Sequence, residues 1–285
     1  MHTYEIVANG LEFPEGPVVM ADGSVIVVEM TGGRITRCWN GKKEVIREYD
    51  EGPNGAATGP DGALYVCNNG GHGHLINGGE PKTGSIDRID LATGKADRLY
   101  ASCDGEPLSS PNDLVFDSDG NLWFTDLGKV RKNGKSYGGL YCARPDGSSI
   151  VQIAGQTFSY NGIGISPDNR TVYVADTYQA RVYAFERKIE PQQPRLVANV
   201  PGMVYLDSLA MTQSGNICVA TFIDGAISVV TPEGHVTRKP FDDYYVTNIA
   251  FGGADMCDAW ITFSQRGLLV KTRWEEPGLN LAFNA

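Results

Sequence analysis

The sequence lacks the features of a membrane-spanning, secreted or zinc-binding protein. Its 285 residues contain no run of about 18 apolar residues, the length that a membrane-spanning helix needs. The N-terminal stretch MHTYEIVANG has no basic leader followed by an apolar core, so we expect no secretory signal. The six cysteines include no CxxC pair, and the four histidines form no HxxxH motif. We therefore predict a cytoplasmic protein with reduced thiols and no contact with membranes.

A basic surface is also missing. The formal net charge is −10, whereas proteins that bind nucleic acids usually carry clusters of Lys and Arg. An acidic surface mainly favours solubility. We expect a small-molecule partner, no nucleic acid, and a monomer or weak homo-oligomer.

No segment of useful length has the periodicity of a helix. The 35 glycines and 15 prolines instead indicate many turns, and 13 Tyr and 10 Phe favour strands. Since 41% of the residues are apolar, the chain is able to form a packed core. These properties predict an all-β protein.

A pattern recurs six times along the chain. In SYNGIGISPDNRTVYVADT (residues 159–177), a polar residue starts a short strand, a turn follows seven residues later, and an alternating strand comes next. The same offset of seven occurs in five of the six stretches, and in the last it is about six. The polar residues that start the stretches are Glu15, Asn54, Asn112, Asn161, Asp207 and Asn248.

Each stretch is followed by a third strand and a more variable fourth one, except that the sixth lacks a fourth. Four antiparallel strands per unit of about 40–50 residues, repeated six times, are typical of a six-bladed β-propeller. We predict one domain over residues 1–285. The N-terminal TYEIVAN resembles the fourth strands, so we expect it to close the ring as the outer strand of the last blade; the tail GLNLAFNA is an alternative for that place.

The six polar residues are predicted to form a ring around the central channel, because the first strand of each propeller blade lines it. All six carry a side-chain oxygen, and Glu15 and Asp207 bring two negative charges into a narrow space. A divalent cation would offset their repulsion. Oxygen ligands suit Ca²⁺, Mg²⁺ or Mn²⁺, and Zn²⁺ also accepts them. Taken singly, Asn-Gly and Asp-Gly pairs are also common turn formers.

Residues at the end of each second strand are expected around the mouth of the channel. They are Glu29, Asn69, Asp126, Asp176, Thr221 and Ser264. Loops that carry His72, His74, Arg131, Tyr178 and Phe222 are candidates to shape a substrate pocket, and the segments His72–Asn77 and Lys129–Tyr137 to set substrate choice. For each of them a solvated loop residue is the alternative.

The ordered motifs FPEGPV, SPNDLVFDSDGNLWFTD, YNGIGISPDNRTVYVADT and LDSLAM resemble those of the gluconolactonase/regucalcin (senescence-marker-protein) family of six-bladed propellers. The resemblance extends over about residues 3–275. It implies that Glu15, Asn161 and Asp207 hold one divalent metal, most readily Ca²⁺, and that Asn112 lies beside the metal and contacts the substrate. Asn54, Asp113, Asp126 and Tyr178 complete the candidate substrate contacts.

The implied chemistry is hydrolysis of a lactone, with a sugar-acid lactone as the first candidate. The ion would polarise the carbonyl, and Asp207 would act as the general base for the attacking water. Two positions depart from the family pattern. Ser208 stands where a glycine is common, and Ser110 stands where animal members have an arginine, so specificity for sugar lactones does not carry over on that contact.

Two other functions stay open. A phosphotriesterase-like hydrolase could use a similar Asn/Asp/Glu site, and a pocket too apolar for a polyol would favour it. A metal-stabilised propeller could also bind a ligand without turnover, because a fold does not define a function. No obvious Ser-His-Asp triad stands out in the sequence, which fits a metal-dependent route better than an acyl-enzyme.

Overall fold

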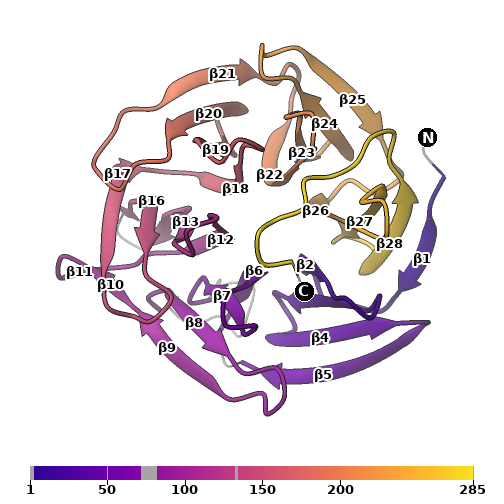
Figure 1. Cartoon of the computed structure of the whole chain (residues 1–285), viewed down its shortest axis with the longest axis horizontal. Coiled ribbons are helices and arrows are strands. Elements are labelled where there is room, and N and C mark those ends of the chain that lie inside the picture. The colour runs from indigo at the N-terminus through magenta and orange to yellow at the C-terminus, as the bar shows by residue number, and fades with distance from the viewer. Residues whose placement is uncertain (1–2, 50, 72–81, 132–133, 285) are drawn as a thin grey trace.

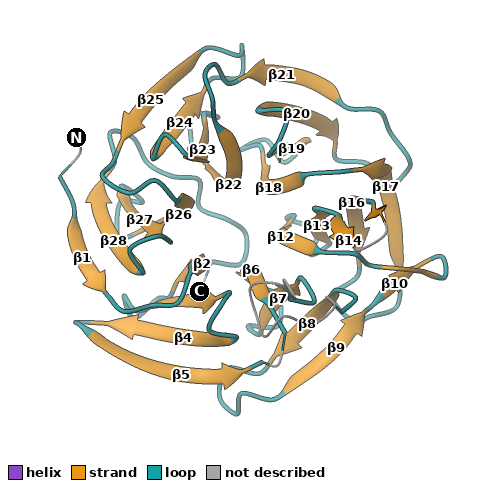
Figure 2. Cartoon of the chain, turned by 180° about the vertical axis from the view of Figure 1, so that it is seen from behind, coloured by secondary structure: helices purple, strands orange, loops and turns teal. Residues whose placement is uncertain are grey.

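Six four-stranded antiparallel sheets surround a central axis in the computed structural model, which describes residues 3–49, 51–71, 82–131 and 134–284 (Figures 1 and 2). The prediction of a six-bladed β-propeller is confirmed. The predicted loops His72–Asn77 and part of Lys129–Tyr137 lie outside the described residues, as does the pair His72 and His74. In the described part of the chain, no helix has the length and apolar character needed to cross a membrane.

The strands follow the sequence units closely. Blade 1 contains β2 (Pro14–Val19), β3 (Val25–Glu29), β4 (Arg34–Trp39) and β5 (Lys42–Glu48). Blade 2 contains β6 (Pro53–Thr58), β7 (Leu64–Asn68), β8 (Ser85–Ile89) and β9 (Ala96–Tyr100). Blade 3 contains β12 (Pro111–Phe116), β13 (Leu122–Asp126), β16 (Gly138–Ala143) and β17 (Ile150–Thr157).

The second half of the ring repeats this order. Blade 4 contains β18 (Tyr160–Ile165), β19 (Thr171–Asp176), β20 (Arg181–Glu186) and β21 (Arg195–Asn199). Blade 5 contains β22 (Tyr205–Met211), β23 (Ile217–Phe222), β24 (Ala226–Val230) and β25 (Val236–Pro240). Blade 6 contains β26 (Val246–Gly252), β27 (Asp258–Phe263), β28 (Leu268–Arg273) and β1 (Glu5–Ala8).

Two short hairpins interrupt the repeat. They are β10 (Ser102–Cys103) with β11 (Glu106–Pro107), and β14 (Lys129–Arg131) with β15 (Gly134–Ser136). The sequence pattern predicted the second of these segments as a loop, but Lys129 and Ser136 are paired across it. All six cysteines are free, as predicted; four of the five buried ones lie in the blades, and Cys103 lies in β10.

The ring is closed by the N-terminal strand, as predicted. β1 pairs with β28 in antiparallel register, with Glu5 opposite Lys271. Because both chain ends contribute to blade 6, the sheet has no open seam between first and last blades. The apolar core lies between neighbouring blades; for example, Ile227 of blade 5 and Ile249 and Val270 of blade 6 belong to one buried cluster.

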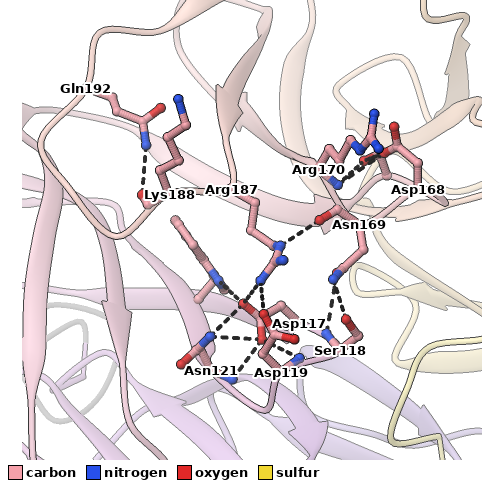
Figure 3. A network of polar contacts seen from close by, with 12 residues as sticks. Asp117, Ser118, Asp119, Asn121, Asp168, Asn169, Arg170, Arg187, Lys188 and Gln192 are labelled. Carbon is pink, nitrogen blue, oxygen red and sulfur yellow. Dashed lines mark hydrogen bonds and ion pairs between the residues drawn. The ribbon is translucent and has the colours of Figure 1, made fainter.

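Polar turns tie adjacent blades together on one face of the ring. Asp117, at the turn that follows the inner strand of blade 3, accepts hydrogen bonds from Trp123 Nε1 (3.0 Å) and from Arg187 of blade 4 (3.0 Å). Figure 3 shows the contact between Asp117 and Arg187. Arg187 also donates to the carbonyl of Asn169, in the equivalent turn of blade 4 (2.6 Å). Burial alone would raise the pKa of Asp117, but these hydrogen bonds and those from Asn121 hold it below its usual value.

The C-terminal tail occupies a place that the sequence did not decide. It does not join the last blade but runs to the centre of the ring, where the C-terminus lies (Figures 1 and 2). Its residues alternate between half-buried and exposed, with Leu279, Leu281 and Phe283 turned inward. Each of these three packs against a different core cluster.

The inward side chains close one end of the central channel. Together with apolar residues from all six inner strands, they line a cavity of about 120 Å³. The tail contacts the ends of the inner strands, such as Phe116 and Met211, whereas the predicted polar ring lies at their beginnings. The tail therefore covers the end of the channel that lies opposite the ring.

If the tail seals the channel, a charge on its inward face will be costly. We expect Leu281→Asp to lower the free energy of unfolding by about 2 kcal/mol, because it places a carboxylate among apolar side chains. The neighbouring exposed residue offers a matched control, since Ala282→Asp adds the same charge to the outer face. Urea unfolding of both variants checks this, and equal losses would show that the tail does not plug the channel.

Candidate active site

The six predicted ring residues all lie near the beginning of an inner strand. Each of these strands carries a register shift next to the ring residue, for example between Glu15 and Val18 in β2 and between Leu206 and Leu209 in β22. The same irregularity occurs in the other four inner strands. A bulge re-aims a side chain out of the regular pleat. The repeat thus gives six equivalent positions around one axis.

Glycines after three ring residues allow the inner strands to approach closely. A Cβ atom at Gly162 would lie 2.5 Å from the carbonyl oxygen of Asp207, and one at Gly16 would lie 2.8 Å from that of Asn54. Such distances exclude any other residue without backbone movement. Asn161-Gly162 is therefore part of strand β18, and not a turn. The turn interpretation is wrong for this pair. The glycine instead allows β18 to approach the backbone of blade 5.

The side chains of Glu15 and Asp207 in the ring and of Asp113 beside it form a group of interacting carboxylates. Burial and the charge of Asp207 raise the pKa of Glu15 well above its usual value, while Thr247 and Asn248 oppose this by hydrogen bonding. Asn248 Nδ2 donates to Glu15 Oε2 at 3.2 Å. Burial, opposed by a hydrogen bond from Asn161, raises the pKa of Asp207. The repulsion between the Glu15 and Asp207 carboxylates is the unfavourable interaction that we predicted from the sequence.

Asp113 lies beside the ring and lines the cavity. It faces the next blade, since its Oδ1 lies 2.7 Å from the position of a Cβ at Gly55. Burial raises its pKa to about 7, although the Leu114 amide and the Ser208 side chain donate to it. The hydroxyl of Ser208, where the family commonly has glycine, thus contacts a carboxylate of the ring.

Asn161 presents an oxygen without a partner. Its Nδ2 donates to Thr177 Oγ1 at 3.1 Å, and its backbone carbonyl accepts from Thr125 Oγ1. These contacts fix the amide, yet its buried Oδ1 accepts no hydrogen bond. An unsatisfied buried acceptor costs about 1–3 kcal/mol, so it usually marks a missing partner.

Asp207 differs from the other ring residues in its access to solvent. It is partly exposed, whereas the other five are buried. Asn54 and Asn112 are 8% and 7% exposed at the channel wall. Asp207 is therefore the ring residue that lies nearest to the solvent.

The donor set is compatible with a hard cation. Among the described residues, no group of three or more His, Cys, Asp or Glu side chains could hold a metal ion. The predicted set is different in kind, because it combines the carboxylates of Glu15 and Asp207 with the amide oxygen of Asn161. An unpartnered oxygen next to two repelling carboxylates fits a divalent ion that prefers oxygen.

The residues predicted around the mouth are instead buried. Glu29, Asn69, Asp126, Asp176, Thr221 and Ser264 are all at most 5% exposed. Asp126 accepts hydrogen bonds from the amides of Ser109 (2.7 Å), Ser110 (2.8 Å) and Gly128 (2.9 Å). It therefore holds the backbone that leads into Asn112, instead of presenting its carboxylate to the channel.

The remaining predicted contact, Tyr178, lies at the mouth. It is 52% exposed, and its ring packs on those of Phe158 and Tyr205. Sequence reasoning did not include Phe158 or Tyr205, although both stand two or three residues before a ring residue. It also missed Thr125 and Thr177, whose hydroxyls orient Asn161; no local pattern singles out these threonines.

Lys129 organises the neighbouring loops. Its ammonium is buried and donates to the carbonyls of Asn69 and Lys82, the latter at 3.1 Å. Burial lowers the pKa of Lys129 to about 8. Lys129 thus connects the β14–β15 hairpin of blade 3 to the loop of blade 2.

Comparisons with known proteins point to one family. The sequence model of the SMP-30/gluconolactonase/LRE-like region matches residues 13–265. A gluconolactonase from Zymomonas mobilis is 26% identical over 263 residues, which cover 81% of this chain and 70% of that protein.

Two solved structures have the same fold. A gluconolactonase from Xanthomonas campestris has a TM-score of 0.77 at 24% identity and is matched over 93% of this chain and 87% of that one. Regucalcin from Agrobacterium tumefaciens, described as a calcium-binding protein, has a TM-score of 0.77 at 18% identity, with 98% of both chains covered.

The positioning role of Asp126 leads to a stability prediction. Asp126→Ala removes a buried acceptor of three backbone hydrogen bonds, so we expect the free energy of unfolding to fall by about 3 kcal/mol. Asp146, an exposed turn residue that accepts from the Ser148 amide, is the control, and Asp146→Ala should cost less than about 1 kcal/mol. Chemical denaturation distinguishes them, and similar losses would contradict the role of Asp126.

Proposed function

The chain belongs to the SMP-30/gluconolactonase/LRE-like family, and on that premise we propose that it is a metal-dependent lactonase. The reaction is hydrolysis of a cyclic ester to its hydroxy acid in the central channel. The observation that carries the proposal is the buried, unpartnered Asn161 Oδ1 beside the carboxylates of Glu15 and Asp207. A gluconolactonase among the relatives supports the substrate class.

Glu15, Asn161 and Asp207 would hold one divalent cation. Calcium is the first candidate, since the donors are oxygens and a structural neighbour is described as calcium-binding; Zn²⁺, Mg²⁺ and Mn²⁺ are alternatives. When bound, such an ion supplies polarisation of the lactone carbonyl and stabilises the negative charge that develops on its oxygen.

Asp207 is the proposed general base. Of the six ring residues it is the one that is not fully buried, and an ionised carboxylate next to the substrate is able to accept a proton. Its carboxylate removes a proton from water as the water oxygen adds to the carbonyl carbon. The same proton is returned to the ring oxygen of the lactone as the carbon–oxygen bond breaks.

The other channel residues position the substrate. The amides of Asn112 and Asn54 line the channel wall and offer both donors and acceptors to the ester. Asp113 lies next to them in the ring, and Asp126 acts through the backbone of Ser110 and the segment that leads to Asn112. The rim aromatic Tyr178 faces the outer part of the substrate.

A phosphotriesterase-like reaction at the same site is the second candidate. The aromatic side chains at the mouth favour it over polyol chemistry, because they offer few hydrogen bonds. A panel that pairs lactones with a dialkyl aryl phosphate distinguishes the two. A binding protein without turnover would hydrolyse neither class with any metal.

Metal removal tests the lactonase most simply. We expect EDTA to abolish hydrolysis of the best lactone in the panel and an excess of Ca²⁺, Mn²⁺ or Zn²⁺ to restore it, because the carbonyl loses its polarising charge. Proton release in a weakly buffered assay with a pH indicator measures the rate. Turnover that persists in EDTA would rule out the metal route.

Substitution of the base separates metal binding from folding. In EDTA at pH 8, Asp207→Asn should raise the free energy of unfolding by about 1 kcal/mol, since it removes one of the repelling charges. The variant should lose both hydrolysis and the rise in melting temperature that a divalent ion gives the unsubstituted protein. Differential scanning calorimetry with and without Ca²⁺ checks these shifts.

Asp224 provides the control for this substitution. It is a half-buried carboxylate of blade 5 that pairs with Arg238 outside the ring. Asp224→Asn should keep the response to divalent ions and lose some stability. If Asp207→Asn behaved in the same way, the assignment of Asp207 to the metal site would be wrong.

A further inference from the structure

Six aromatic side chains form a continuous wall near the beginnings of the inner strands, where the ring residues lie. In order along the wall they are Phe158, Tyr178, Tyr205, Phe222, Tyr245 and Phe13. Neighbouring ring centroids are 5.7, 5.5, 5.3, 5.9 and 6.2 Å apart. These separations lie within the range of favourable aromatic pairs, so the wall is a single packed unit.

The wall adjoins the ring directly. Phe13 and Tyr205 stand two residues before Glu15 and Asp207, and Tyr245 stands three residues before Asn248. Phe222 lies opposite Tyr205 in the pairing of β22 with β23. The wall therefore rises from the proposed metal site.

The wall covers only one side of the mouth. Its side chains come from blades 4, 5, 6 and 1 and from the segment that leads into blade 4. On blades 2 and 3, the residues two positions before the ring residue are Gly52 and Ser110, which are small. At these positions the ring is thus flanked by aromatic residues on one side and by small residues on the other.

Part of the wall is exposed to solvent. Tyr178 and Tyr245 are 52% and 39% exposed, and the other four side chains are half-buried. Core aromatics such as Phe124 and Phe263 are fully buried instead. A contiguous exposed apolar surface next to a candidate active site typically marks a ligand contact.

The positions two residues before the six ring residues offer few partners for a polyhydroxylated substrate. The residues two positions before the six ring residues include no charged side chain. Ser159 is one of them, but its hydroxyl donates to Asp176 at 2.5 Å. Recognition of several hydroxyls would need side chains that pair with them, because unpaired buried hydroxyls are costly.

We propose that the aromatic wall binds an apolar arm of the substrate, so that the preferred lactones carry an alkyl or aryl substituent. This inference rests on the proposed lactonase function. The ester group would lie at the ring, and the arm would extend from it along Tyr205, Tyr178 and Phe222. Free sugar lactones lack such an arm and gain nothing from the wall.

A homologous series of substrates tests the wall. The series consists of γ-butyrolactones with 4-alkyl groups from methyl to heptyl, with glucono-1,5-lactone for comparison. Burial of one methylene group is worth about 0.8 kcal/mol, so kcat/KM should rise about fourfold with each of the first added methylenes. Every substituted lactone longer than propyl should exceed glucono-1,5-lactone.

Two wall variants and one matched control locate the effect. Tyr178→Ala and Phe222→Ala should each lower the heptyl-to-methyl ratio of kcat/KM by about tenfold, because they remove aromatic surface from the arm. Tyr244 neighbours the wall in sequence and is 67% exposed, but it makes no ring contact within the described residues. Tyr244→Ala should leave the ratio within about twofold of the unsubstituted protein.

The outcomes separate the wall from the function. Lactone hydrolysis whose kcat/KM does not change with chain length, or for which glucono-1,5-lactone is the best substrate, would contradict the proposed role of the wall. It would not contradict the lactonase function. If no lactone is hydrolysed, the proposed function is wrong. The role of the wall is then tested by the binding of a lactone analogue. By calorimetry in Ca²⁺, a 5-heptyl pyrrolidinone should then bind at least tenfold tighter than its methyl analogue, and Tyr178→Ala should abolish the difference; equal binding would overturn the wall.

Discussion

The close approach of the inner strands around the axis is the constraint on which the site depends. Backbone atoms of neighbouring blades come so near that Gly16, Gly55 and Gly162 admit no Cβ. The side chain that precedes each of these glycines has no room between the blades and lies in the channel. The same packing that closes the propeller thus concentrates oxygen donors in one small volume.

Electrostatics follow from this geometry. Glu15, Asp207 and Asp113 share a site that the tail seals from below with Leu279, Leu281 and Phe283. Burial raises the pKa of all three carboxyl groups. Such an arrangement of buried carboxylates destabilises the folded protein. Active sites commonly contain groups whose pKa is perturbed in this way. A bound cation would turn the repulsion into affinity.

Much of the fold could be predicted from the sequence because the repeat is regular. The offset of seven residues between ring residue and turn sets the register of the inner strands, and a shift of one residue would have turned Asn161 away from the channel. The match of TYEIVAN to the fourth strands placed β1 for the same reason. Both predictions depend on local patterns that recur.

The remaining features arise from contacts between distant segments. Asp126 ends a second strand as predicted, but only the folded chain brings it under the amides of Ser109 and Ser110. The path of the tail depends on the shape of the channel, which no local pattern encodes. The aromatic wall combines side chains from four blades; its signal, an aromatic residue shortly before a ring residue, is visible only once the ring is known.

The central claim is that a single divalent cation occupies the ring. Anomalous diffraction from crystals soaked in Mn²⁺ tests it most directly. The account predicts one strong anomalous peak within coordination distance of Glu15, Asn161 Oδ1 and Asp207. A channel without such a peak, or a peak bound only by residues outside the ring, would contradict it.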